Sequence, residues 1–403
     1  MKVLIVAPMV PRAQGSGAIP ILLYAELTGL RERGKVTLLS AVGDEPGEAE
    51  AAAELAAAGF DARIADRRVP GSARARWRRR ARMASAWLRG RRPWRSIWFA
   101  DPGIQRLLDE VSASADFDLV LVEDSAMAGY RLPAGVANAL VEHEVLRPRP
   151  PAPPPADPRG WPRWALGELD WRRRPRFQRW AWNRFERVLV FTERDREAIA
   201  EMAPEVAQRV RVSPFGLTLP EPADPARVVP GNLLFVGNFT HQPNRDAARW
   251  LAAEIMPALR RADPAASLTI VGSSPPAAIR ALAGPGIEVV ADAPSVRPYI
   301  ERAAVVAAPI RTGGGMRMKV LEAMATAKAV VTTPRGVEGF DCFAEEPPLR
   351  VAAEDPEAFA AAVAELLAAP AERAELAAAA RAFAEAHYSP GAWAERLEAL
   401  FRA

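Results

Sequence analysis

The stretch "AAVVAAPIRTGGGMRMKVLEAM", residues 303–324, contains a strand, a loop and a helix in immediate succession. Its first part, 303–310, is a short run of alanine and valine broken by a proline, which is typical of a buried parallel strand. Three glycines follow, and Val320, Leu321 and Met324 then form the apolar side of a helix. This order of elements favours an α/β fold.

The same alternation of strand and helix runs along the chain twice. The strand-like segments are 2–7, 36–41, 117–124, 137–145, the first half of 184–202, and then 232–238, 266–273, 287–292, 303–310 and 329–334. A chain of 403 residues exceeds the roughly 250–300 that one hydrophobic core usually holds. We therefore predict two Rossmann-like α/β domains joined near 214–230, with a ligand site in the cleft between them. One large α/β sheet is the alternative.

Bulk composition excludes several classes of protein. The single cysteine, Cys342, rules out an internal disulfide framework, and the three histidines lie far apart in sequence, so no metal site is predicted. The N-terminal "MKVLIVAPMV" is too short and too soon broken by proline for a secretory signal. No apolar run approaches the roughly 20 residues of a membrane span. We expect a cytoplasmic protein.

Two glycine-bearing loops each follow a strand and precede a helix. Their residues are Gly15, Ser16, Gly17, Gly313, Gly314 and Gly315. Glycine lets backbone N–H groups approach a ligand closely, and the first turn of a helix attracts phosphate. Neither loop has the Walker or the GxGxxG pattern, so plain turns remain the alternative.

Charged residues accompany the second loop. Arg317 and Lys319 stand at the start of the helix, where cations oppose its dipole unless an anion such as a diphosphate is bound. The alternative is a surface pair between Lys319 and Glu322, three positions apart, which stabilises a helix by only a few tenths of a kcal/mol.

The segment "NLLFVGNFTHQPNRDAARW", together with the residues up to 341, strongly resembles the C-terminal domain of GT-B glycosyltransferases of family 4. The resemblance implies two Rossmann-like domains facing across a cleft, with a C-terminal helix that crosses back to the first domain. It places the acceptor-side domain at 1–215, the donor domain at 216–385 and the crossover helix at 386–403. It also implies a metal-independent, retaining transfer from a nucleoside-diphosphate sugar, a co-substrate rather than a tightly bound cofactor, to a hydroxyl acceptor.

The resemblance also assigns roles to residues. Glu322 matches the glutamate that bonds the ribose hydroxyls, a task suited to a carboxylate because it accepts two hydrogen bonds. Arg317 and Lys319 would offset the diphosphate charge, and His143 in "VEHEV" would lie near the transferred sugar, with a structural histidine as the alternative. The other donor-binding candidates are Gly313, Gly314, Gly315, Ala293, Gly15, Ser16, Gly17, Gly237 and Asn244.

The chain departs from the family pattern at two places. Gly314 stands where many members carry a first glutamate, and the usual Arg and Lys after the strand at 232–238 are missing. His241, Asn244 and Arg245 are weak replacements. A catalytically silent nucleotide-sugar-binding scaffold and a nucleotide-sugar isomerase or epimerase are therefore the alternative functions.

Two basic stretches, 67–95 and 159–187, hold nine of the eleven tryptophans once Trp98 is included. On a helix Trp77 and Leu88 would share one face with arginines around much of the rest, the composition of an interfacial helix on an anionic membrane. This favours peripheral attachment at the inner face of the membrane and a lipid-linked or cell-surface glycan acceptor. An ordinary arginine-rich surface is the alternative, and no recognised module favours nucleic acid.

Overall fold

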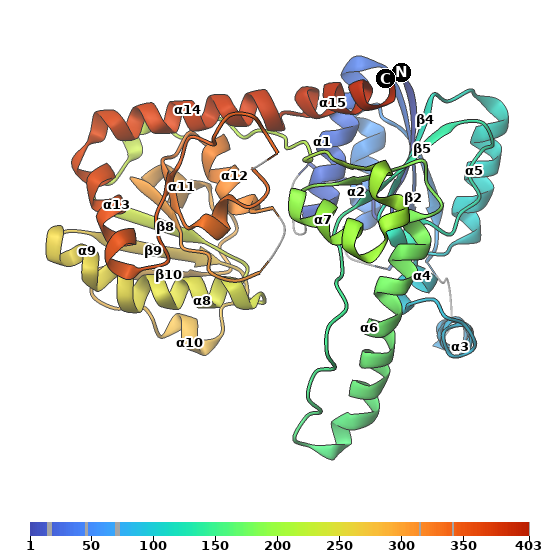
Figure 1. The fold of residues 1–403 in the computed structure, drawn as a ribbon, viewed down its shortest axis with the longest axis horizontal. Coiled ribbons are helices and arrows are strands. Elements are labelled where there is room, and N and C mark those ends of the chain that lie inside the picture. The colour runs from blue at the N-terminus through green and yellow to red at the C-terminus, as the bar shows by residue number, and fades with distance from the viewer. Residues whose placement is uncertain (14–17, 45–46, 69–72, 314–315, 341, 403) are drawn as a thin grey trace. The chain divides into compact units, whose positions relative to one another are not determined.

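Figure 1 shows the chain as a computed structural model, which describes residues 1–13, 18–44, 47–68, 73–313, 316–340 and 342–402. The chain divides into two compact units, one formed by Met1–Thr218 with Pro390–Ala403 and the other by Leu219–Ser389. Each unit contains its own parallel sheet. The predicted α/β class is confirmed, and the single-sheet alternative is wrong.

The first unit is built on a seven-stranded sheet of order β3-β2-β1-β4-β5-β6-β7. Its strands are β1 Lys2–Val6, β2 Lys35–Val42, β3 Asp61–Asp66, β4 Leu119–Glu123, β5 Ala137–Glu142, β6 Arg187–Val190 and β7 Val210–Val212. Its helices are α1 Ala18–Arg33, α2 Glu48–Ala57, α3 Ala73–Arg89, α4 Trp94–Trp98, α5 Pro102–Ser114, α6 Trp161–Trp182, α7 Glu193–Met202 and α15 Pro390–Arg402. Short 3-10 turns are η1 Ser125–Met127, η2 Pro158–Gly160 and η3 Pro204–Arg209.

The second unit has a six-stranded sheet of order β10-β9-β8-β11-β12-β13. Its strands are β8 Asn232–Val236, β9 Ser267–Gly272, β10 Ile287–Ala291, β11 Val305–Ala308, β12 Val330–Thr332 and β13 Arg350–Val351. Its helices are α8 Gln242–Trp250, α9 Met256–Ala262, α10 Ala277–Arg280, α11 Arg297–Arg302, α12 Met318–Ala325, α13 Pro356–Ala368 and α14 Pro370–Tyr388. A π-helical turn, η5 Leu251–Ile255, joins α8 to α9, and 3-10 turns lie at η4 Pro225–Arg227 and η6 Pro334–Val337.

The central strands are mostly apolar because helices cover both faces of each parallel sheet. Strand β4 is buried at every residue, and so is β11. In each sheet the order in which successive strands are added reverses at one place. This switch point lies between β1 and β4 in the first unit and between β8 and β11 in the second. Such switch points leave a crevice at the carboxyl ends of the strands, where ligands of open α/β sheets bind.

The C-terminal helix α15 packs on α1 within the first unit. Gly29 of α1 lies so close to the start of α15 that an added Cβ would be 2.0 Å from the Pro390 carbonyl oxygen. Trp393 and Leu397 are buried, and Glu398 forms a 3.0 Å ion pair with Arg33 of α1. The chain therefore returns to the first unit after α14.

We expect Gly29→Ala to destabilise the first unit by about 1–3 kcal/mol, because the new methyl group must displace the backbone of Pro390. In an unconstrained helix the same change is stabilising by roughly 0.5–1 kcal/mol. Gly391→Ala in α15 is the matched control, since its Cβ would meet nothing within 4 Å. Urea denaturation measures both free energies of unfolding. Equal stability of Gly29→Ala and the wild-type protein would contradict the close packing of α15.

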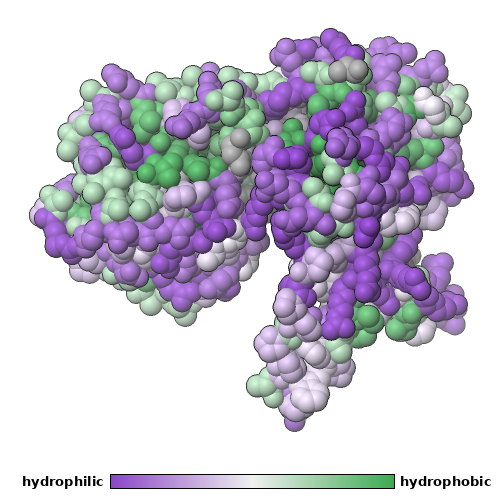
Figure 2. All heavy atoms as spheres, viewed as in Figure 1, coloured by the Kyte–Doolittle hydropathy of each residue, from purple (hydrophilic) through white to green (hydrophobic). Residues whose placement is uncertain are grey.

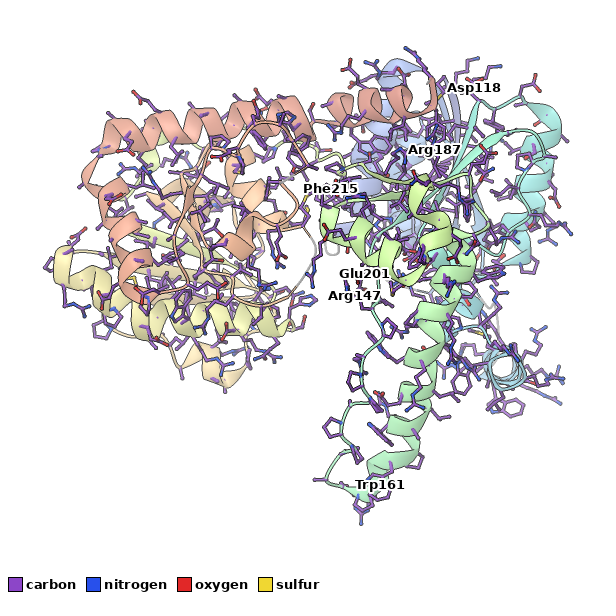
Figure 3. The ribbon with its side chains drawn as sticks, in the orientation of Figure 1. Asp118, Arg147, Trp161, Arg187, Glu201 and Phe215 are labelled. Atoms are coloured by element: carbon purple, nitrogen blue, oxygen red, sulfur yellow. The ribbon has the colours of Figure 1, made fainter. Side chains whose placement is uncertain are left out.

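Helix α6 and the proline-rich segment before it form an arm that extends from the first sheet (Figure 1). The segment, residues 148–157, lies along α6: the indole N–H groups of Trp161 and Trp164 donate to the carbonyls of Pro155 and Ala152, each at 3.1 Å. Arg147 anchors its start through a 2.5 Å ion pair with Glu201 (Figure 3). The tryptophans of α6 therefore hold the proline-rich chain in place.

Candidate donor site

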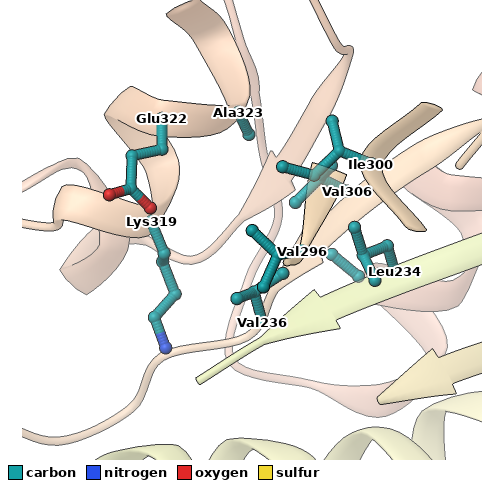
Figure 4. Close-up of a pocket in the computed structure, with 9 residues that line it drawn as sticks. Leu234, Val236, Val296, Ile300, Val306, Lys319, Glu322 and Ala323 are labelled. Carbon is teal, nitrogen blue, oxygen red and sulfur yellow. The ribbon is translucent and has the colours of Figure 1, made fainter. Parts of the chain in front are cut away.

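A small pocket opens beside the switch point of the second sheet (Figure 4). Strands β8 and β11 and helices α11 and α12 supply its walls. Its lining residues are Leu234, Val236, Val296, Ile300, Val306, Ala307, Lys319, Glu322 and Ala323. Lys319 and Glu322, both on α12, are the charged members of an otherwise apolar set. The pocket therefore combines apolar walls with two ionisable side chains of opposite sign.

Lys319 is held by residues of two other elements. Its ammonium donates a hydrogen bond to Oδ1 of Asn244 on α8 and lies 4.6 Å from the centre of the Phe235 ring. Loss of hydration lowers the pKa of Lys319 to about 7, the charge of Arg317 adds to this effect, and the charge of Glu322 opposes it. Lys319 is therefore only about half protonated at neutral pH, and a bound anion would raise its pKa.

Glu322 lies one helical turn beyond Lys319 and is exposed at the edge of the pocket. Although solvent reaches part of the side chain, the carboxyl group loses hydration to the surrounding protein atoms, and this raises its pKa. The positive charge of Lys319 lowers the same pKa by a smaller amount. Within the described part of the chain, its carboxylate makes no hydrogen bond or ion pair. The surface pair between Lys319 and Glu322 considered above is absent there, so both oxygens of Glu322 are available to a ligand.

Arg317 does not line the pocket but fixes the loop that precedes α12. Its guanidinium donates to the carbonyl oxygens of Gly313 at 3.0 Å and Arg335 at 3.3 Å, and it lies 3.5 Å from the Glu338 carboxylate. Gly313 has a φ of 93° and an added Cβ would be 3.0 Å from Pro243, so this position requires glycine. Arg317 thus connects the glycine loop to the segment after β12.

Other predicted donor residues lie at the carboxyl ends of neighbouring strands. Gly237 directly follows β8 and packs against Asn244, whose side chain would be 3.1 Å from an added Cβ. Ala293 follows β10, two residues after the strand ends and three before Val296 of the pocket wall. Five predicted residues, Gly15, Ser16, Gly17, Gly314 and Gly315, lie outside the described residues.

His143 belongs to the first unit, directly after β5. Its Nε2 lies 2.8 Å from Oε2 of Glu123 at the end of β4, and the ring of Phe191 meets it edge-on with centroids 5.4 Å apart. Sequence reasoning missed Glu123, although the acidic pair that ends the apolar run in "FDLVLVED" was a usable signal. It also missed Phe235, which no motif distinguishes from an ordinary core residue.

Comparison with known proteins gives a family match in the second unit. Residues 230–369 match the family model described as Glycosyl transferases group 1. This range contains the pocket, Asn244 and the loop around Gly313. No curated protein sequence matches the chain significantly.

Solved structures match the whole chain. TarM from S. aureus has a TM-score of 0.67 at 10% identity, with 100% of this chain and 99% of TarM covered. HepE from Anabaena, in complex with UDP and glucose, has a TM-score of 0.62 at 11% identity, with both chains covered completely. Sucrose-phosphate synthase from Thermosynechococcus elongatus has a TM-score of 0.61 at 16% identity, covering 100% and 98%.

A group 1 glycosyl transferase domain within a chain that has the GT-B fold throughout defines a class: this protein is a glycosyltransferase enzyme of the GT-B type. The predicted fold and the predicted enzyme class are both confirmed. In the described residues no group of three or more His, Cys, Asp or Glu side chains could hold a metal ion. No helix there is long and apolar enough to span a membrane.

Proposed function

We propose that this enzyme transfers a sugar from a nucleoside-diphosphate sugar to a hydroxyl acceptor with retention of anomeric configuration. The pocket at the β8–β11 switch point carries the proposal, because it combines apolar walls with a carboxylate and a cation on one helix. Glu322 would bond the ribose hydroxyls, while Lys319 and the loop at Gly313 would face the diphosphate. Arg317 would act on the diphosphate through the loop that it fixes.

The first unit would hold the acceptor, and His143 would lie near the transferred sugar. Stabilisation of the charge that develops on the leaving diphosphate would be the main catalytic contribution of Lys319 and the loop. Lys319 and the loop at Gly313 would offset the diphosphate charge themselves, which supports a metal-independent transfer. TarM has been solved with UDP and α-GlcNAc-glycerol, and HepE with UDP-glucose, which supports a nucleotide donor and a hydroxyl acceptor.

Binding of a nucleotide donor is tested by thermal shift against UDP, GDP, ADP, CDP and dTDP, beginning with UDP. We expect one of them to raise the melting temperature, since a ligand that binds only the native state stabilises it by mass action. No shift with any of them at millimolar concentration would refute the donor site. Slow hydrolysis of the corresponding nucleotide sugar separates an enzyme from a silent scaffold, and mass spectrometry with NMR of the product gives the acceptor and the anomer.

We further propose that α3 and the arm around α6 attach the first unit to an anionic membrane. Both carry large apolar side chains in water: Trp77 is 68% exposed, Leu88 67% and Trp161 at the tip of α6 52% (Figure 3). Helix α3 has no acidic residue, and hydrophilic and hydrophobic residues alternate over its region (Figure 2). Trp87 of α3 is buried instead. One face of the helix therefore packs against the protein, and the other face is exposed to solvent.

Replacing Arg74, Arg78 and Arg80 with glutamine is expected to weaken binding to vesicles of phosphatidylcholine and phosphatidylglycerol roughly a hundredfold, at about 1 kcal/mol for each arginine. All three side chains are exposed. Sedimentation with vesicles at low and high salt measures the effect, which should shrink with screening. Trp77→Ala should weaken binding with little salt dependence, whereas Val229→Ala, an exposed apolar residue of the second unit, is the control. Unchanged vesicle binding in the triple variant would show that α3 is an ordinary arginine-rich surface and does not bind the membrane.

A further inference from the structure

The first turn of α8 packs closely against two loops of the second unit. An added Cβ at Gly237, directly after β8, would lie 3.1 Å from the side chain of Asn244. In the loop before α12, an added Cβ at Gly313 would lie 3.0 Å from the ring of Pro243. Because both contacts are this close, the side chain of Asn244 has little freedom to move away from the end of β8.

The amide of Asn244 has a protein partner at each end. Its Nδ2 donates a 2.7 Å hydrogen bond to the backbone carbonyl of Asn238, and its Oδ1 accepts a hydrogen bond from the ammonium of Lys319. Since a carbonyl cannot donate, Nδ2 must face Asn238 and Oδ1 must face Lys319. The amide therefore presents an acceptor oxygen to the lysine.

Lys319 reaches this oxygen from α12 with an extended side chain (Figure 4). Its ammonium also lies 4.6 Å from the centre of the buried Phe235 ring, within the range of a cation–π contact. An ammonium has three N–H donors, and Asn244 takes one of them. Within the described residues the side chain makes no other hydrogen bond, so the remaining donors can bind a ligand of the pocket.

The charge on Lys319 depends on few neighbours. Loss of hydration lowers its pKa to about 7, the charge of Arg317 acts in the same direction, and the charge of Glu322 opposes them. From α8 and β8 its printed partners are a neutral amide and a neutral ring, and Asp246 of α8 forms a 2.9 Å ion pair with Arg311. A hydrogen bond to an acceptor oxygen favours the charged form of an amine, so the amide supports the cation that dehydration disfavours.

We propose that Asn244 is a positioning residue for Lys319: its amide oxygen holds the ammonium beside the pocket and leaves the other N–H groups for the diphosphate of the donor. Asn244 then acts on the donor through Lys319 and does not bind the donor itself. The role at the diphosphate rests on the proposed sugar transfer. The contact between the two side chains depends on the second unit alone.

The contact is tested without a nucleotide by NMR of the full-length protein labelled with ¹³C-lysine. The chain has only four lysines, Lys2, Lys35, Lys319 and Lys328, and Lys319→Arg assigns the signal of interest. The ¹³Cε shift of each lysine follows the charge of its amine. For Lys319 in the wild-type protein we expect a titration midpoint near pH 7.

Two variants of Asn244 should move this midpoint in opposite directions. Asn244→Leu keeps the size of the side chain but removes the acceptor, so the midpoint should fall by about one pH unit. Asn244→Asp places a carboxylate beside the ammonium and should raise the midpoint by about 1–3 pH units. Lys328 donates to the carbonyls of Glu301 and Ala303 instead, so its signal is an internal control and should titrate alike in all proteins.

Gln242→Glu is the matched control for the new charge, because it adds a carboxylate at an exposed position of the same helix. It should leave the midpoint of Lys319 nearly unchanged. With a native fold shown by circular dichroism, an unchanged midpoint in Asn244→Leu would overturn the proposal. An unchanged midpoint in Asn244→Asp would do the same.

A double-mutant cycle separates positioning from direct binding. It uses whichever of UDP, GDP, ADP, CDP and dTDP gives the largest thermal shift. Asn244→Leu should weaken binding at pH 7 about fivefold, since a midpoint lowered by one unit leaves about a tenth of Lys319 charged. In the Lys319→Met background the same substitution should have no further effect. An equal loss in both backgrounds would show that Asn244 binds the donor directly and would refute positioning.

The NMR titration and the nucleotide experiments can fail independently. If no nucleotide binds but the Lys319 midpoint moves as expected, the proposed function fails and the contact between Asn244 and Lys319 stands. If a nucleotide binds and the midpoint does not respond to Asn244, the donor pocket stands and the positioning role is wrong.

Discussion

Glu322→Ala is expected to lower kcat/KM for the nucleotide sugar by about 100- to 1000-fold. The carboxylate would accept hydrogen bonds from two ribose hydroxyls, and a hydrogen bond to a charged group contributes about 1.5–3 kcal/mol. Because the Glu322 carboxylate has no partner within the described residues, its loss breaks no native contact there. The melting temperature without ligand should therefore stay unchanged.

The ribose assignment is tested with the nucleotide that gives the largest thermal shift and its 2′,3′-dideoxy analogue. The wild-type enzyme should bind the analogue more weakly than the nucleotide, whereas Glu322→Ala should bind the two equally. Combining the two proteins with the two ligands gives a thermodynamic cycle that isolates the interaction between the carboxylate and the hydroxyls. Glu322→Gln keeps one acceptor oxygen and should be intermediate. Glu288→Ala, an exposed carboxylate of β10, is the control. If Glu322→Ala still discriminates between the two forms as the wild-type enzyme does, the assignment is wrong.

The second large effect is a pH dependence of nucleoside-diphosphate affinity. With a pKa of about 7, Lys319 is half charged at neutral pH and almost neutral at pH 9. A diphosphate binds the charged form, so affinity should fall about 50-fold between pH 7 and pH 9. The phosphate, with a second pKa near 6, is already ionised there and contributes little. Calorimetry in two buffers of different ionisation enthalpy should show uptake of about half a proton at pH 7.

Two variants separate Lys319 from other titrating groups. Lys319→Arg keeps a permanent charge and should bind with little pH dependence, while Lys319→Met should bind weakly at every pH. Without nucleotide, the folding stability should depend on pH in the opposite sense to the affinity. The unfolded chain keeps the Lys319 proton up to about pH 10.5, so the free energy of unfolding should rise with pH above 7. A similar fall in affinity in Lys319→Arg would assign the titration to another group.

Much of the fold could be predicted from local pattern. Short apolar runs such as β4 and β11 are distinct from the helices around them because parallel strands are buried on both faces. Two rounds of this pattern on 403 residues were enough to predict two sheets. The proximity of Lys319 and Glu322 also followed from sequence, since residues three apart share a helix face.

The surroundings of these residues could not be predicted in the same way. Arg317 was expected at the diphosphate, but its guanidinium bonds the carbonyls of Gly313 and Arg335. The ring of Phe235 beneath Lys319 and the amide of Asn244 come from residues 75 or more positions away. No spacing rule links them, because α8, β8 and α12 meet only after the sheet has formed.

The sequence by itself determined which elements form, how many sheets they make and which charged residues share one helix. Tertiary structure alone decided their protonation. Glu123 and His143 are 20 positions apart in sequence, and their side chains lie 2.8 Å apart because β4 and β5 are neighbours in the sheet. Periodicity depends on the geometry of a single element, whereas a pKa depends on how far all neighbouring elements exclude water.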